Sequence, residues 1–450
     1  MIFGPLANAF KIPDLKRRLL FTLAMIAIYR VGAFIPTPGI NSQRLAQFFA
    51  SLAGTQGGTI FGIMNLFSGG AVERLTIFAL GIMPYITASI IMQLLIPVIP
   101  SWEKMVKEGG EQARRVITQY TRYATIALSL IQSFFIALWL ENPTLFGGLQ
   151  IVDTPGWGFR LLTVLTLTSG SAFIMYLGEQ VTERGIGNGA SILITAGIIS
   201  RLPTAVYQLF VLASPFSQAR RQIDPLRLLL LCVMMIGVIV AVVQLIQGQR
   251  KIPVQYARRM VGRRMYGGQT TYIPLRVNQA GVIPIIFSQS LLVFPATIAG
   301  LVPNPMLQQV ASSLMHGQVL YTVLYILLIV FFSFFYTALT FNPIDIADNI
   351  KKYGGFLPGI RPGNPTAEYL DFIMVRVTLA GAVFLAAIAI LPDMVGLWMK
   401  IPQSVTGFFG GTSMLIVVGV MLDTIRQIES HLLLRHYDGF MRTGRIRGRR

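Results

Sequence analysis

The chain has 450 residues, of which 54% are hydrophobic and only 12% are charged, yet its formal net charge is +19. A soluble core of this size would interleave charged faces with apolar ones, so the composition excludes a soluble globular protein and indicates a membrane protein. Its single cysteine, Cys232, excludes an internal disulfide and a four-cysteine metal site.

Long uncharged runs follow one another along the sequence, and residues 277–344 contain no Lys, Arg, Asp or Glu at all. A bilayer core of roughly 30 Å needs about 20 helical residues, and windows of that length predict ten spans. They are expected near residues 19–36, 72–97, 119–140, 160–178, 190–212, 227–247, 280–300, 318–340, 373–392 and 404–424. The sequence therefore predicts an all-α polytopic membrane protein.

The first expected span follows a basic N-terminal segment that includes Lys16, Arg17 and Arg18. A cleavable signal peptide has the same charge pattern, but no small-x-small cleavage site follows, and Arg30 comes instead. We expect a first helix that stays in the protein.

Basic residues set the expected orientation. With the N-terminus inside, 28 of the 37 Lys and Arg residues fall in cytoplasmic segments. Positive charge is concentrated on the cytoplasmic side of membrane proteins. We therefore expect both termini to be cytoplasmic.

Five spans in each half, residues 1–213 and 214–450, give the halves opposite orientations, as in inverted-repeat membrane proteins whose functional site lies at the repeat interface. Two pairs of matching motifs favour such a repeat. Spans two and seven read G-x-x-P-x-I at 81–86 and 281–286, and spans five and ten read G-x-S-x-L-I at 189–194 and 411–416. The alternative is that these small residues only let helices pack closely.

Residues 60–70 form an apolar stretch that is too short to cross a bilayer. Segments of this length are often re-entrant or interfacial, and Gly69 and Gly70 give backbone freedom to a moving segment. An interfacial helix on the outer surface is the alternative.

Several of these segments resemble one known family. The matching sequences are GIMPYITASI at 81–90, GEQVTERGIGNG at 178–189, FGGTSMLIVV at 409–418, FSGG at 67–70 and NPTA at 364–367. They closely resemble the SecY family, the central subunit of the bacterial Sec translocon, and the likeness runs from about residue 10 to 440. It implies two five-helix halves hinged around a central pore, a lateral gate that opens to lipid, and a protein-conducting channel that needs no cofactor.

The resemblance also implies a constriction ring in the pore. Its members are Ile82, Ile86, Ile194, Ile286, Ser290 and Ile416. A ring of apolar side chains disfavours a water column when the pore is empty. The internal repeat singles out Ile86, Ile194, Ile286 and Ile416 independently, although ordinary helix packing also uses isoleucine.

By the same resemblance, residues 60–70 are a plug that blocks the closed pore from the outer side, with a hinge at 68–70. The apolar side chains of the plug are Phe61, Ile63, Met64, Leu66 and Phe67. Thr87, Gln132 and Gln289 fall in the spans that frame the lateral gate. Hydrogen bonds between helices in lipid are worth about 0.6 kcal/mol each, so they would hold the gate shut weakly. Structural roles unrelated to gating are the alternative.

Two basic loops, 248–279 and 341–371, are expected on the cytoplasmic side. The positive-inside rule alone accounts for their charge, but the resemblance makes them docking sites, with Arg258, Arg259 and Arg361 as contacts. It implies partners that the chain does not contain. These are the SecE and SecG subunits, the SecA ATPase, the ribosome through its rRNA, signal peptides and nascent chains, and membrane lipids, at the bacterial inner membrane or, in a photosynthetic cell, the thylakoid.

Other functions fit the sequence less well. It lacks the P-loop motif and the H-E-x-x-H motif, so we expect no enzyme activity and no cofactor. An ion-coupled secondary transporter shares inverted repeats and broken helices, but it normally keeps ionisable residues near the membrane midplane. The expected spans are almost bare of such residues, and energy for transport must come from a partner.

Overall fold

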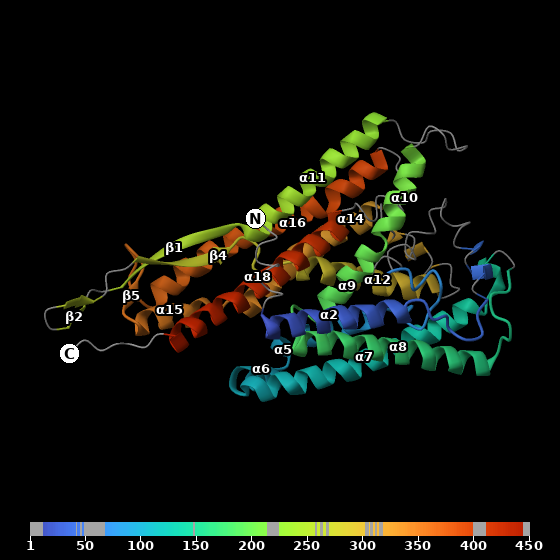
Figure 1. The fold of residues 1–450 in the computed structure, drawn as a ribbon, viewed down its shortest axis with the longest axis horizontal. Helices are drawn as coiled ribbons and strands as arrows, with labels where there is room; N and C mark the ends of the chain where they lie inside the picture. Colours follow the sequence, from blue (N-terminus) through green and yellow to red (C-terminus); the bar gives the residue numbers. More distant parts are fainter. Residues whose placement is uncertain are drawn as a thin grey trace.

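The computed structural model describes residues 12–41, 43–45, 47–48, 68–146, 149–213, 225–256, 259–261, 264–266, 270–301, 306, 309–310, 313–314, 318–398 and 411–443. Helices dominate these residues, and most of them lie in two groups (Figure 1). The expected fold class, an all-α polytopic membrane protein, is confirmed.

The first group contains the helices from the first half of the sequence (Figure 1). They are α2 (Pro13–Gly32), α5 (Met83–Val98), α6 (Pro100–Glu108), α7 (Gly110–Leu140) and α8 (Trp157–Arg184). A 3-10 turn, Pro143–Phe146, lies in the connection between α7 and α8, which pack against each other. α9 (Gly189–Ser200) and α10 (Leu202–Ala213) follow and are separated at Arg201.

The second group contains helices from the second half. They are α11 (Pro225–Gln247), α14 (Val319–Thr340), α16 (Asn364–Trp398) and α18 (Gly411–Thr443). α12 (Ile283–Leu301) and α9 lie between the two groups in Figure 1. Among the described residues, helices from the two halves of the sequence pack together in at least two places, where α12 packs on α5 and α7 and where α18 packs on α9.

Seven helices in the described part of the chain are long and apolar enough to cross a membrane, or eight if the bent pair α5–α6 counts as one span. The remaining expected spans correspond to shorter or more charged helices. Residues 283–296 of α12 are apolar but short, and α2 carries Asp14 and Arg30 in its first and last turns. Residues 404–410 of the expected tenth span lie outside the described residues, and the rest of that span, 411–424, belongs to α18.

The expected second span, 72–97, ends close to the end of α5 at Val98, but its helix begins later than predicted. Residues 68–82 form turns, and helix begins only at Met83, because Leu75 and Gly81 have positive φ angles of 43° and 58°. At the other end, Ile99 is extended and precedes Pro100, as proline requires of its neighbour. α5 and α6 therefore meet at a bend of 99°.

The G-x-x-P-x-I motifs take the same local structure in both halves. Gly81 and Gly281 have φ angles of 58° and 62°, and each is followed two residues later by the first residue of a helix, α5 or α12. Proline is favoured in the first turn of a helix, where its missing N–H is not needed. The motif therefore marks a left-handed turn followed by a helix start.

The G-x-S-x-L-I motifs also coincide in structure. Gly189 is the first residue of α9 and Gly411 the first residue of α18. A Cβ at Gly189 would collide with the carbonyl of Gly178 in α8, and one at Gly411 with the carbonyl of Ile388 in α16. Each glycine thus lets the start of a helix lie directly on the backbone of the preceding helix.

The two basic loops fold together into one projecting arm (Figure 1). β1 (Gln249–Tyr256) pairs antiparallel with β4 (Thr270–Arg276) and with β5 (Gly355–Phe356), while β2 (Arg259–Val261) and β3 (Arg264–Tyr266) form a hairpin. Helix α15 (Pro343–Lys352) packs on β5 and α16. Ile252, Val254 and Leu275 share an apolar core with residues of α15 and α16. Strands were not expected here, although apolar residues alternate at 252 and 254.

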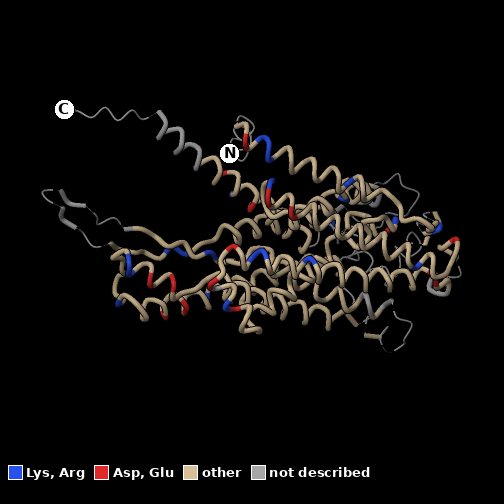
Figure 2. The backbone as a smooth tube through the Cα atoms, turned by 90° about the horizontal axis from the view of Figure 1, so that it is seen from below, with Lys and Arg blue, Asp and Glu red and all other residues tan. Residues whose placement is uncertain are grey.

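Charge is distributed unevenly over the molecule. Lys, Arg, Asp and Glu gather in the arm and toward helix ends, and long stretches of the helices between carry none (Figure 2). Such a band of uncharged helix is what a hydrocarbon layer requires.

The close contact at Gly189 leads to a testable expectation. Gly189→Ala places a Cβ against the Gly178 carbonyl and 2.9 Å from the Cβ of Val181. Overpacking of this kind costs about 1–3 kcal/mol, so the thermal unfolding midpoint in mild detergent should fall. Gly237→Ala is the matched control, because its Cβ meets nothing within 4 Å. Equal midpoints for the two variants would contradict the proposed role of Gly189.

Candidate functional site

The isoleucines of the expected constriction ring come together at the centre of the molecule. One apolar cluster contains Ile82, Ile86, Ile194, Ile286 and Ile416. They are supplied by α5 and the residue before it, α9, α12 and α18. Each is at most 4% exposed. We call these five side chains the central cluster.

The sixth expected ring residue lies at the same contact. Ser290 of α12 is 1% exposed, and its hydroxyl is 3.8 Å from the sulfur of Met83 at the start of α5. The hydroxyl donates to a weak, polarisable acceptor, so this polar residue joins α5 to α12 without introducing charge.

Sequence reasoning missed several members of the same apolar core. Ile90 of α5, Ile198 of α9 and Phe287 of α12 belong to it and are buried. The spacing in the sequence could have indicated two of them, because residues four apart lie on the same face of a helix. Ile90 lies four residues after Ile86, and Ile198 lies four residues after Ile194. Phe332 of α14 packs edge-on against Phe287 with ring centroids 5.6 Å apart, a contact that no local pattern indicates.

The expected gate residues lie on the three helices that meet on one side of the central cluster. α12 contacts both α5 and α7. Thr87 and Gln289 are each 2% exposed, and Gln132 is partly buried. Among the described residues, the side-chain oxygen of Gln289 is buried without a hydrogen-bond partner. A buried, unpaired amide oxygen costs about 1–3 kcal/mol, so this oxygen of Gln289 does not stabilise the packing of α12.

Charged contacts lie away from the central cluster. Arg122 of α7 forms a two-point ion pair with Glu179 of α8, with N–O distances of 2.9 and 2.8 Å. Arg160 and Glu141 approach to 2.7 Å near the other end of the same two helices. These ion pairs join α7 to α8 within one group of helices and do not cross to α12.

The expected plug residues, Phe61, Ile63, Met64, Leu66 and Phe67, lie outside the described residues. The described chain resumes at Ser68, which is 2% exposed. Gly69 and Gly70 follow with φ angles of 64° and 94°. Glycine is required at both positions by the left-handed backbone.

The three expected docking arginines differ in how they are placed. Arg258 lies outside the described residues, and Arg259 is the first residue of β2. Arg361 is exposed in the connection between β5 and α16. Gly359 and Gly363 flank it with φ angles of 81° and 104°, and its carbonyl accepts a 2.9 Å hydrogen bond from the hydroxyl of Thr366. Arg361 therefore sits in a fixed turn with its side chain in solvent.

Comparison with solved structures shows where this fold occurs. A structure described as "The structure of a protein conducting channel" has a TM-score of 0.65 at 17% identity and covers 95% of this chain and 97% of that chain. Sec61 in the canine ribosome-channel complex from the endoplasmic reticulum has a TM-score of 0.61 at 16% identity and covers 95% and 97%. At these identities the likeness concerns the fold.

Comparison of sequences goes further. Protein translocase subunit SecY of Aquifex aeolicus (strain VF5) is 44% identical over 433 residues, covering 96% of this chain and 98% of that protein. The subunit of the same name from Streptomyces galbus is 48% identical over 443 residues, covering 97% and 99%. The SecY family model matches residues 76–425. The chain belongs to the SecY family.

Proposed function

We propose that this integral membrane protein is the channel subunit of a protein translocase, and that the central cluster is the constriction through which unfolded preproteins pass. The observation that carries this proposal is the convergence of five isoleucines from four separate helices. Membership of the SecY family supports it, since the relatives are named protein translocase subunits. An ion-coupled secondary transporter, the alternative function, has no such support.

The constriction acts as a seal that contains no charge. Moving an isoleucine side chain from water into apolar surroundings is worth about 1.5–3 kcal/mol, so the side chains stay together when no substrate is present. A passing polypeptide meets apolar atoms that form no specific hydrogen bonds with it. The ring therefore tolerates many sequences while it disfavours a continuous water column.

The two halves, residues 1–213 and 214–450, act as the two sides of the channel. They contact each other through α12 with α5 and α7 on one side and through α18 with α9 on the other. The first contact is the lateral gate, with Thr87, Gln132 and Gln289 at or near it. Its opening releases transmembrane segments into lipid. The apolar residues at 61–67 act as the plug in the closed state; a structural neighbour described as a study of the plug domain of SecY supports this role.

The arm is the docking surface for the partners that supply energy. We place the arm and both termini in the cytoplasm and the channel in the bacterial inner membrane, because the basic residues gather on that side. The partners are SecE and SecG, the SecA motor and the ribosome, with Arg258, Arg259 and Arg361 as contacts. Guanidinium groups suit rRNA phosphates, which they bind in a bidentate manner. A neighbour in a ribosome-channel complex supports the ribosome as a partner.

A disulfide between α5 and α12 tests the channel and its gate together. Met83→Cys with Ser290→Cys, in a Cys232→Ser background, joins the two helices where their side chains are 3.8 Å apart. We expect oxidation to block preprotein export into membrane vesicles and reduction to restore it, because the halves can then no longer separate.

The matched control is a disulfide between helices on the same side of the gate. Ser133→Cys with Thr168→Cys joins α7 to α8. The hydroxyl oxygens of Ser133 and Thr168 are 3.2 Å apart. Export should survive this cross-link. Unimpaired export through the oxidised α5–α12 channel would contradict the proposal.

Arg361→Glu tests the arm as a docking surface. An exposed side chain away from packing contacts changes stability by less than about 0.5 kcal/mol, so the membrane level of the variant should stay normal. An arginine that anchors a partner contributes 2 kcal/mol or more, so motor-driven export should fall by about tenfold or more. Arg250→Glu, an exposed change on the same arm, should keep export near normal. Equal loss of abundance and export in Arg361→Glu would instead indicate a folding role.

A further inference from the structure

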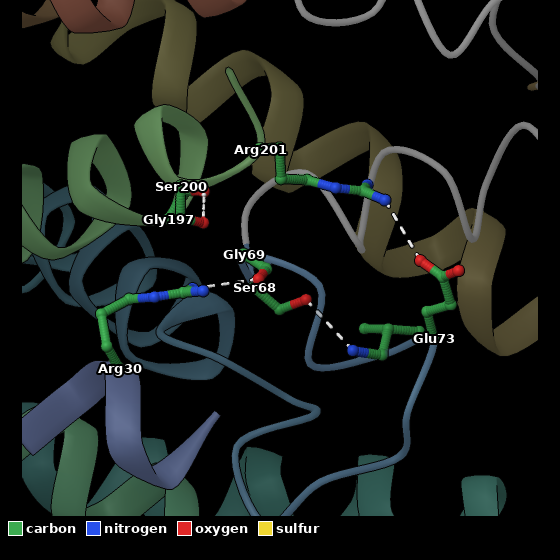
Figure 3. Close-up of polar contacts among 8 residues, drawn as sticks. Arg30, Ser68, Gly69, Glu73, Gly197, Ser200 and Arg201 are labelled. Carbon is green, nitrogen blue, oxygen red and sulfur yellow. Dashed lines mark hydrogen bonds and ion pairs between the residues drawn. The ribbon is translucent and has the colours of Figure 1, made fainter. Parts of the chain in front are cut away.

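Residues 68–76, here called the anchor turn, are tied to two helices that lie far apart in the sequence. Arg30, in the last turn of α2, donates from Nη1 to the carbonyl of Gly69 at 3.0 Å. Arg201, at the end of α9, forms a 3.1 Å ion pair with Glu73. Figure 3 shows the two arginines reaching different points of the anchor turn, Arg30 at Gly69 and Arg201 at Glu73.

The backbone at Gly69 has almost no free space around it. A Cβ at this position would lie 2.8 Å from Nη1 of Arg30, 3.0 Å from Cα of Gly197 and 3.2 Å from the hydroxyl of Ser200. Gly197 and Ser200 belong to α9, and the Ser200 hydroxyl donates to the Gly197 carbonyl (Figure 3). Gly69 is thus held between the guanidinium of Arg30 and the backbone of α9.

Hydrogen bonds fix the rest of the anchor turn. The Ser68 hydroxyl accepts from the Val72 amide at 3.3 Å. Leu75 accepts from the Thr37 amide at 3.0 Å, and the Ile77 amide donates to Ile35 at 3.0 Å. The chain from Ser68 onward is therefore attached to the segment that follows α2.

An aromatic contact places Arg30 in the same assembly. Its guanidinium lies 5.4 Å from the ring centroid of Phe34, and that of Arg74 lies 4.6 Å from the same ring. Cation–π contacts favour a defined position of each guanidinium. Phe34 thus holds Arg30 in place beside Gly69 and links it to the anchor turn a second time.

We infer, on the basis of the proposed function, that Arg30 is a positioning residue that clamps the anchor turn against α9 and thereby keeps the closed channel sealed. The anchor turn leads, through residues 77–81, to Ile82 of the central cluster. Fixing Gly69 therefore fixes the described turn that carries the chain into the start of α5. Gly69 serves close packing, and both glycines, 69 and 70, serve a left-handed backbone.

A thiol at position 68 reports the clamp without any export assay. Ser68→Cys in a Cys232→Ser background places the only thiol at a site that is 2% exposed. Its reaction with a maleimide, measured on the full chain in isolated membranes, proceeds through local opening. Hydrogen bonds to charged groups are among the stronger ones in proteins, and Arg30→Gln removes such a bond from the anchor turn. Local opening should then be more frequent, and the labelling rate should rise about ten- to a hundredfold.

Two further variants keep the test decisive. Arg160→Gln is the matched control, because the Arg160 guanidinium also has a polar partner, Glu141 at 2.7 Å, and an aromatic ring, Trp157 at 5.1 Å. Since Arg160 lies outside the clamp, this variant should leave the labelling rate of Cys at position 68 within about twofold of the parent's. Arg30→Lys keeps the charge at the end of α2 and should give a labelling rate between those of the parent and Arg30→Gln. It replaces Arg30→Gln in the test if that variant lowers the amount of folded protein. Parental labelling rates in both Arg30 variants would overturn the clamp.

Resting ion conductance of the reconstituted channel separates this inference from the proposed function. Arg30→Gln should raise the conductance along with the labelling rate. Faster labelling with unchanged conductance would overturn the role of the clamp in sealing, while the clamp itself would stand. Failure of the parent protein to export any preprotein would instead overturn the proposed function.

Discussion

The apolar contact among α5, α9, α12 and α18 is the interaction on which the arrangement depends. It is where helices from both halves of the sequence meet, and five isoleucines fill it. Each of these isoleucines lies within five residues of the start of its helix, so the four helix starts meet at this contact. Glycine and proline at the starts of α5 and α12, and glycine at the starts of α9 and α18, provide those starts.

The contacts on either side of this centre differ in kind. α7 and α8 are joined by the ion pairs Arg122–Glu179 and Arg160–Glu141. A buried hydrogen bond between the hydroxyls of Ser133 and Thr168 also joins them, so we expect the two helices to move together. The α5–α12 contact has a weak serine–sulfur hydrogen bond, and α12 carries, among the described residues, a buried glutamine oxygen without a hydrogen-bond partner. α12 carries no charged residue, so its separation from α5 and α7 breaks no ion pair. An apolar segment that enters there replaces contacts of similar strength.

Local patterns in the sequence predicted the fold class and the helix order, because hydropathy and glycine–proline motifs act over a few residues. The internal repeat also singled out four isoleucines, at 86, 194, 286 and 416, which lie in one apolar cluster. They did not predict contacts between distant segments. The arm is one example, since β1 and β5 pair across about a hundred residues, and the clamp of Arg30 on Gly69 is another. In the sequence, Arg30 is only a charged residue within the first expected span, 19–36. Only the folded chain shows that it reaches a backbone carbonyl in a turn that precedes α5.

The most direct measurement is photo-crosslinking from the central cluster to a polypeptide arrested in transit. A photoreactive residue at position 416, in α18, should cross-link to the translocating chain. The same residue at position 329 is the control, because Ile329 of α14 is equally buried but lies in a different apolar cluster. The account predicts a cross-link from 416 and none from 329. No cross-link from 416, or equal cross-links from both positions, would contradict it.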